Sequence, residues 1–133
     1  MHGLLSYGAY LPHWRLERSA ITEVMGSGGG RGTRSVANFD EDTTSMGVEA
    51  ARAALAPVGG GGLDGARVDD LIFATAEPAY HEKTNATAIW AALRLGPDTG
   101  ALDATGAVRS GAGSLRLALR SPEATLVVAS GIR

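Results

Sequence analysis

The side chains in this sequence that could do chemistry are scattered, and none of them completes a catalytic or metal-binding motif. Ser110 has the hydroxyl of a nucleophile, but its sequence neighbours include no histidine or lysine to act as a base. Glu77 has the carboxyl group of a general acid or base. His2, His13 and His81 lack the spacing of metal ligands. There is no cysteine, which excludes disulfides, thiolate metal sites and thiol catalysis.

For each of these residues a structural role competes with the chemical one. Ser110 is of a type that caps helices. Glu77 has the character of a solvated loop carboxylate. His81, between Tyr80 and Glu82, fits a surface position better than the wall of a ligand tunnel. We therefore expect structural roles for all three residues.

Composition limits the class of protein. The chain has 133 residues, about one domain, with 44% hydrophobic and 20% charged residues, which suffices for a packed core. A net charge of −2 and 5% aromatics argue against a nucleic-acid partner. No apolar run reaches the roughly 18–20 residues of a membrane span, and no basic segment precedes an apolar run at the start. We therefore expect a cytoplasmic protein that neither binds nucleic acid nor spans a membrane.

The first part of the chain predicts one strand and two helices separated by glycine-rich loops. The apolar run 4–11 predicts a strand buried on both faces, and apolar spacing predicts a helix over 16–25. Acidic residues 40–42 precede a second helix, where their negative charges interact favourably with the positive end of its dipole. That helix is rich in glycine and alanine, which allows close backbone approach. The glycine loops at 26–32 and 59–62 are expected to be flexible.

The rest of the chain alternates strands and helices. Apolar runs predict strands at 71–75, 101–104 and 125–129, and an amphipathic stripe predicts a helix around Ile89 and Trp90. A further helix is expected from Val108 to Leu119. This alternation indicates an α/β fold with helices on the faces of a sheet, in a single domain over 1–133. The last strand is so apolar that we expect it to be central in the sheet.

Four segments, in order, resemble one known superfamily. They are residues 3–16, 40–51, 103–111 and 126–130, and together they are similar to the thiolase superfamily. The likeness is greatest to the branch of 3-hydroxy-3-methylglutaryl-CoA synthase and 3-ketoacyl-acyl-carrier-protein synthase III. It implies a thiolase-like N-terminal half, with a mixed sheet covered by helices, that is incomplete relative to the full fold of two similar halves.

The resemblance also implies a nucleophile that this chain lacks. In the family a cysteine at the start of a buried helix takes an acyl group from coenzyme A, and the helix N-terminus favours its thiolate. The matching position is Val108, which offers no nucleophile and is expected to be a core valine. The branch's acid/base glutamate aligns with Ala76, and only a one-residue shift reaches Glu77. Ser110 and Glu77 are therefore weak catalytic candidates, and no residue is assigned as catalytic.

Substrates and partners follow from the resemblance alone. It implies that the substrate is a coenzyme A thioester and that the protein acts in lipid metabolism. It also implies that no cofactor is bound covalently. Arg31 and Arg34 are weak candidates for contacts with coenzyme A phosphates, since guanidinium matches phosphate geometry. The family's enzymes are dimers. Some members without the cysteine cleave carbon–carbon bonds by retro-aldol chemistry, and these work with a partner that carries an OB-fold and a zinc ribbon.

Three hypotheses stay open at this point. The chain is half of an acyl-CoA enzyme, condensing or retro-aldol in type, that is inactive alone and works with a second thiolase-fold half in a homo- or hetero-oligomer. Alternatively, it is a non-catalytic scaffold or dimerisation subunit of such a complex. The third hypothesis is that it is a fragment of a longer protein.

Overall fold

The computed structural model describes residues 3–56 and 68–132, which form two compact units. Residues 11–41 make the smaller unit, and the other described residues make the larger one. Helices and strands alternate along the chain, so the expected α/β class is confirmed. The glycine loop expected at 59–62 lies outside the described residues. The single domain over 1–133 stays a prediction.

The smaller unit is a pair of antiparallel strands whose connection along the chain contains a helix. Strand β1 (Trp14–Glu17) pairs antiparallel with β2 (Thr33–Val36), and α1 (Arg18–Met25) lies between them. Gly26 ends α1 in the left-handed conformation, which glycine adopts without steric cost. The predicted helix over 16–25 is right from residue 18 onward, but the two short strands were not predicted. Their pairing connects residues far apart in sequence, which local patterns do not reveal.

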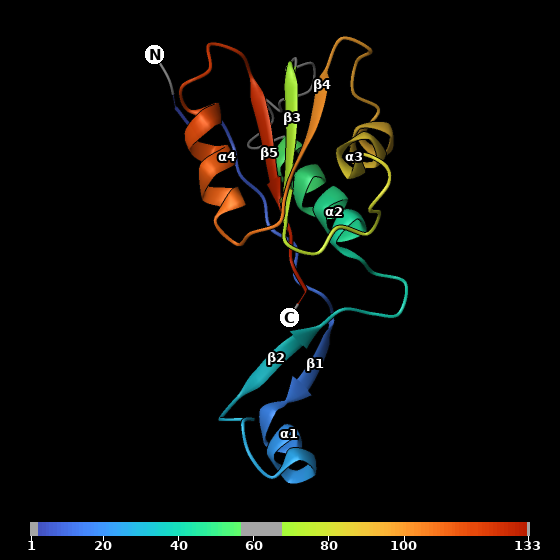
Figure 1. Cartoon of the computed structure of the whole chain (residues 1–133), viewed down its shortest axis with the longest axis vertical. Coiled ribbons are helices and arrows are strands. Elements are labelled where there is room, and N and C mark those ends of the chain that lie inside the picture. The colour runs from blue at the N-terminus through green and yellow to red at the C-terminus, as the bar shows by residue number, and fades with distance from the viewer. Residues whose placement is uncertain (1–2, 57–67, 133) are drawn as a thin grey trace. The chain divides into compact units, whose positions relative to one another are not determined.

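The larger unit is built on a parallel three-stranded sheet (Figure 1). Its strands are β3 (Asp70–Thr75), β4 (Gly100–Thr105) and β5 (Thr125–Ala129), in the order β4-β3-β5. These bounds agree within one residue with the predicted strands. The central strand β3 buries every residue after its first, as expected for a strand covered on both faces.

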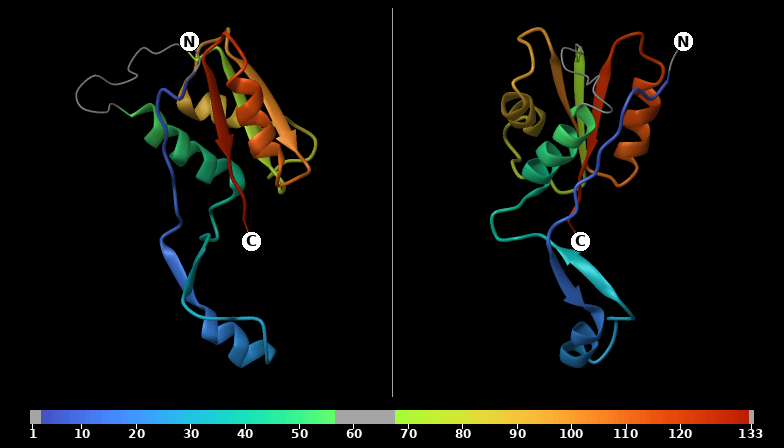
Figure 2. Two further views of the ribbon diagram at one scale, coloured as in Figure 1. Left: turned by 90° about the vertical axis from the view of Figure 1, so that its left-hand side faces the viewer. Right: turned by 180° about the vertical axis from the view of Figure 1, so that it is seen from behind.

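Three helices cover the two faces of this sheet (Figure 2). They are α2 (Thr43–Leu55), α3 (Asn85–Leu93) and α4 (Ser110–Ala118). The connection from β3 to β4 runs toward one edge of the sheet, and the connection from β4 to β5 runs in the opposite direction, past β3 to the other edge. Because such crossovers are right-handed, α3 and α4 lie on opposite faces. Helix α2 packs beside α3.

The core lies between the sheet and the pair α2 and α3. Leu71, Phe73 and Ile89 are fully buried, and Val128 of β5 packs with them. Trp90 packs against the edge of this cluster and its indole Nε1 donates to the carbonyl of Gly96 (2.9 Å). The stripe predicted around Ile89 and Trp90 therefore faces the core as expected.

The start of the larger unit differs from expectation. Residues 3–10 form no regular strand, and Leu4, Leu5 and Tyr7 are at least two-thirds exposed, so the prediction of a buried strand over 4–11 is wrong. Its local pattern suits a strand, but a strand also requires a neighbour to pair with. The last strand, β5, lies at the edge of the described sheet, so the central position expected for it is wrong as well.

Candidate functional site

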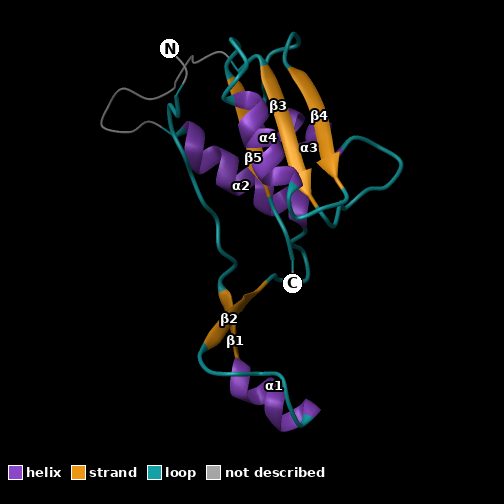
Figure 3. Ribbon diagram, turned by 60° about the vertical axis from the view of Figure 1, so that its left-hand side comes forward, coloured by secondary structure: helices purple, strands orange, loops and turns teal. Residues whose placement is uncertain are grey.

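The candidate residues Glu77, Val108 and Ser110 follow the carboxyl ends of β3 and β4 in the sequence. These two strands lie side by side in the sheet (Figure 3). Glu77 follows β3, and residues 106–110 form the turn from β4 into α4. The backbone N–H of Gly106 donates to the carbonyl of Thr75 (3.2 Å), which joins the two strand ends. In α/β folds ligands bind outside the carboxyl ends of parallel strands, so the fold brings these residues to the expected edge.

Val108 lies in the turn before α4 and its side chain is 71% exposed. The expectation of a core valine is therefore wrong. The residue stands in the turn between β4 and α4, and α4 itself buries only Ser114. The position is open to solvent, and valine brings no hydrogen-bonding or nucleophilic group to it.

Ser110 is the first residue of α4, one position after the N-cap residue Arg109. No side chain caps this helix, so the helix-capping role expected for Ser110 is wrong. Its backbone N–H donates to the carbonyl of Ala107 (3.0 Å), which closes the turn. A nucleophilic role for Ser110 stays a prediction.

Glu77 is held by its backbone and exposed at its side chain. Its N–H donates to Oγ1 of Thr75 (3.1 Å), and its carbonyl accepts from Oγ1 of the buried Thr43 (2.8 Å). The backbone is thus fixed between β3 and α2 while the side chain is exposed. This geometry fits a solvated loop carboxylate, and a role as acid or base stays a prediction.

A polar cluster between β4 and the start of α3 was not predicted from the sequence. One carboxylate oxygen of Asp103, on β4, accepts from the backbone N–H of Asn85 (2.7 Å) and from its side-chain Nδ2 (3.0 Å). The other oxygen accepts from the N–H of Ala86 (2.7 Å). Asp103 therefore supplies the acceptors that the first N–H groups of α3 need. A single carboxylate inside the short apolar strand at 101–104 was the available signal.

The buried Asn85 connects this cluster to the loop that carries His81. Its Oδ1 accepts from the N–H of Tyr80 (2.9 Å) and from Oγ1 of Thr44 (3.4 Å), and its Nδ2 donates to the carbonyl of Tyr80 (2.9 Å). The ammonium of Lys83 lies 4.2 Å from the centre of the Tyr80 ring. His81 itself is exposed, which agrees with the surface position expected for it.

The arginines proposed for coenzyme A belong to the smaller unit. Arg34 is on β2 opposite Leu16, and Arg31 lies in the turn before β2. Arg31 is exposed and Arg34 is half-buried. A contact of either residue with coenzyme A stays a prediction.

Neither a cluster of metal-binding side chains nor a membrane-spanning helix is found among the described residues. Within residues 3–56 and 68–132, no three histidine, aspartate or glutamate side chains gather as a metal site would require. In the same part of the chain, no helix has the length and apolar content to cross a membrane.

Comparison with known sequences finds hydroxymethylglutaryl-CoA synthases among the relatives of this chain. The chain is 35% identical over 118 residues to hydroxymethylglutaryl-CoA synthase from Thermococcus sibiricus, which covers 88% of the chain and 33% of the relative. It is 32% identical over 136 residues to the enzyme of that name from Aeropyrum pernix, covering 98% of the chain and 35% of the relative. The chain thus spans about a third of the length of these relatives. No family model matches it.

Solved structures agree on the fold. The priming β-ketosynthase of the R1128 polyketide pathway is 27% identical, with a TM-score of 0.76 over 96% of the chain and 41% of the ketosynthase. A hydroxymethylglutaryl-CoA synthase from Bacillus subtilis reaches a TM-score of 0.81 over 99% of the chain and 36% of the enzyme, at 22% identity. The resemblance expected from the sequence is confirmed: the chain has a thiolase-like fold and is similar to part of these longer proteins.

Proposed function

We propose that this hydroxymethylglutaryl-CoA synthase-like chain acts on coenzyme A thioesters together with a second thiolase-fold half, and that it supplies no acyl nucleophile. The observation that carries the proposal is similarity to hydroxymethylglutaryl-CoA synthases over as much as 98% of the chain. A solved relative was captured in complex with 3-hydroxy-3-methylglutaryl coenzyme A, which supports a thioester as the ligand.

Val108 determines the kind of chemistry that this half can support. It occupies the turn before α4, where a thiolate would lie near the positive end of the helix dipole. With valine there, no acyl group can be transferred to the chain at this position. The reaction therefore proceeds without an acyl-enzyme at residue 108, as in retro-aldol cleavage, or receives its nucleophile from the second half.

The remaining roles are assigned to the weaker candidates. Glu77, whose backbone is held by Thr43 and Thr75 just after β3, is the candidate acid or base. Arg31 and Arg34 contact the phosphates of coenzyme A, because each guanidinium presents several N–H donors to phosphate oxygens. The assembly is a cytoplasmic oligomer of lipid metabolism. An OB-fold and zinc-ribbon protein is its further partner if the chemistry is retro-aldol.

Binding is tested by titrating acetyl-CoA into the chain in a calorimeter. We expect saturable binding that weakens about tenfold or more in the Arg31→Ala/Arg34→Ala variant, because two charge-assisted contacts are lost. Arg116→Ala, on the exposed side of α4, serves as the matched control and should bind like the wild type. Absence of heat from acetyl-CoA at every concentration would contradict the proposal.

The nucleophile position is tested by restoring a thiol. Val108→Cys places a thiol before the start of α4, and Val24→Cys places a similarly exposed one in the last turn of α1. A helix start favours a thiolate and a helix end disfavours it. We expect Val108→Cys to take up an acetyl group from acetyl-CoA faster than Val24→Cys, as measured by mass spectrometry. Equal rates would show that position 108 has no special reactivity.

A further inference from the structure

The buried polar side chains of the larger unit are concentrated around one exposed loop, residues 77–83, which connects β3 to α3. Among residues 3–56 and 68–132, five polar side chains are buried: Thr43, Thr44, Thr75, Asn85 and Ser114. All but the last hydrogen-bond to this loop or to a residue that holds it. Because burying a polar group costs free energy unless the group is hydrogen-bonded, such a concentration marks a loop whose backbone is closely specified.

The first fixed point of the loop is Glu77. Its backbone N–H donates to Oγ1 of Thr75 (3.1 Å), and its carbonyl accepts from Oγ1 of Thr43 (2.8 Å). Thr43 is the first residue of α2, so this bond connects the loop to a helix that packs in the core. Pro78 follows, and its ring restricts the backbone at the next position.

The second fixed point is Tyr80, whose two backbone groups both bond to the side chain of Asn85. The N–H of Tyr80 donates to Oδ1 (2.9 Å), and its carbonyl accepts from Nδ2 (2.9 Å). The same Nδ2 donates to the carbonyl of Lys83 (3.4 Å) and to the carboxylate of Asp103 (3.0 Å). The main chain of the loop is therefore held at both ends, whereas its residues, apart from the half-buried Pro78, are exposed.

Stability alone does not account for this arrangement. Water can satisfy the backbone groups of an exposed loop, so the loop needs no buried side chains for that purpose. A fixed backbone matters where a side chain has to meet a ligand, since an acid or base acts only within about 2.6–3.2 Å of the proton that it transfers. The loop follows the carboxyl end of β3, and ligands of α/β folds bind outside this edge of the sheet.

We propose that Thr43 and Asn85 are positioning residues, which hold the loop 77–83 so that Glu77 meets the acyl group of a bound coenzyme A thioester. The proposal rests on the proposed function, in which Glu77 is the candidate acid or base. Thr43 and Asn85 are each 1% exposed, so they act through the backbone of the loop and do not touch the ligand. Their loss should affect recognition of the acyl group and leave the contacts to the rest of coenzyme A unchanged.

Titration of the chain with acetyl-CoA and with coenzyme A in a calorimeter isolates this contribution. The two ligands differ only by the acetyl group on sulfur, so all other contacts cancel in the ratio of their dissociation constants. We expect the wild type to prefer acetyl-CoA about threefold to tenfold, as one net hydrogen bond provides. Thr43→Val removes the hydroxyl at nearly constant volume and should abolish this preference. Thr43→Ser keeps the hydroxyl and should retain it.

Two further variants act at other points of the loop. Asn85→Ser shortens the side chain and removes both bonds to the backbone of Tyr80. Pro78→Gly frees the backbone between the fixed points without changing any buried polar side chain, so it tests the loop even if Asn85→Ser does not fold. Each should abolish the preference for acetyl-CoA. Ser114→Ala, at the buried polar residue of α4, is the matched control and should behave like the wild type.

Hydrogen exchange of the free protein shows whether a variant has loosened the loop. We expect faster exchange at residues 77–83 in Thr43→Val, Asn85→Ser and Pro78→Gly than in the wild type. Faster exchange together with an unchanged preference for acetyl-CoA would overturn the proposal, because the bonds would then serve the fold alone. Unchanged exchange in all three variants would also overturn it, because the loop would not depend on these residues.

The two ligands also separate this proposal from the proposed function. If the wild type binds acetyl-CoA and coenzyme A equally tightly, Glu77 does not meet the acyl group, and the positioning role fails while coenzyme A binding stands. A parallel loss of affinity for both ligands in Thr43→Val would likewise count against a role at the acyl group. Absence of binding of either ligand to the wild type would contradict the proposed function itself, and the positioning role with it.

Discussion

Helices α3 and α4 are both nine residues long and cover opposite faces of the same sheet, yet they differ in how much they bury. Helix α3 buries Asn85, Ala86 and Ile89, and its first N–H groups bond to Asp103. Helix α4 buries only Ser114 and has no side-chain cap. Its leucines Leu115 and Leu117 and its C-cap residue Leu119 are 43–59% exposed.

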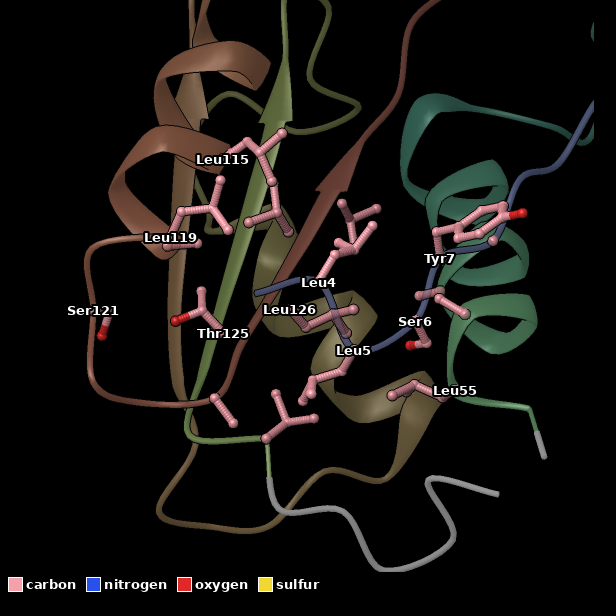
Figure 4. A pocket seen from close by; sticks show the side chains of 18 of the residues that line it. Leu4, Leu5, Ser6, Tyr7, Leu55, Leu115, Leu119, Ser121, Thr125 and Leu126 are labelled. Atoms are coloured by element: carbon pink, nitrogen blue, oxygen red, sulfur yellow. The ribbon is translucent and has the colours of Figure 1, made fainter. Parts of the chain in front are cut away.

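The difference lies in what each helix packs against. Helix α3 is covered by α2 as well as by the sheet, so its apolar stripe is enclosed. Helix α4 packs against the sheet and also borders a groove between β5 and residues 3–8, which Leu115 and Leu119 line (Figure 4). Two helices of equal length therefore give an enclosed core on one face and a more open surface on the other. The candidate residues Val108 and Ser110 lie at the start of the less enclosed helix.

The largest difference should come from removing an apolar side chain from each helix. Ile89→Ala leaves a cavity in the enclosed core, and we expect a loss of about 3–4 kcal/mol in the free energy of unfolding. Leu119→Ala removes a side chain of equal size from the open groove, and we expect a loss below about 1 kcal/mol. Urea unfolding measures both. Equal losses would show that the two faces are equally packed.

The next largest effect concerns the start of α3. Asp103→Ala leaves three N–H donors without their acceptor, and we expect a loss of about 3 kcal/mol in the free energy of unfolding. The exposed Asp98 provides the control, and Asp98→Ala should stay within about 0.5 kcal/mol of the wild type. A similarly small effect of Asp103→Ala would mean that water replaces the carboxylate at the start of α3.

The smallest effect compares one helical glycine on each face. A Cβ on Gly47 of α2 would lie 3.0 Å from Val128 and 3.3 Å from Phe73, whereas a Cβ on Gly113 of α4 would meet nothing within 4 Å. Overpacking costs about 1–3 kcal/mol, whereas the higher helix propensity of alanine over glycine stabilises by about 1 kcal/mol. We expect Gly47→Ala to destabilise by about 1 kcal/mol and Gly113→Ala to stabilise by about 0.5–1.

Thermal unfolding followed by circular dichroism gives the sign of both changes. The melting temperature should fall for Gly47→Ala and rise for Gly113→Ala. A rise for both variants would show that the layer between α2 and β5 has space for a methyl group.

Local patterns in the sequence were sufficient for most of the larger unit. The apolar runs at 71–75 and 125–129 predicted β3 and β5, because a strand covered by helices needs apolar side chains on both faces. Acidic residues 40–42 marked the start of α2, where Asp42 is the N-cap and bonds to the N–H of Ser45. The pairing of β1 and β2 was missed, because it depends on contacts between distant residues.

The candidate site was only partly predictable. The sequence alone showed that no cysteine is present and that Val108 stands where the resemblance expects one, because a residue's chemistry does not depend on the fold. It did not reveal that Asp103 would bond to Asn85, which is 18 residues away along the chain. That contact exists only because β4 places its carboxylate beside the start of α3.

The sequence by itself thus determined the alternation of strands and helices, the absence of a thiol and the resemblance to condensing enzymes, since these depend on residue type and local spacing. Only the tertiary structure decided that Val108 is exposed, that β5 is an edge of the described sheet and that residues 3–10 form no regular strand. Each of these depends on whether another part of a polypeptide is present to cover a side chain or to accept a backbone hydrogen bond.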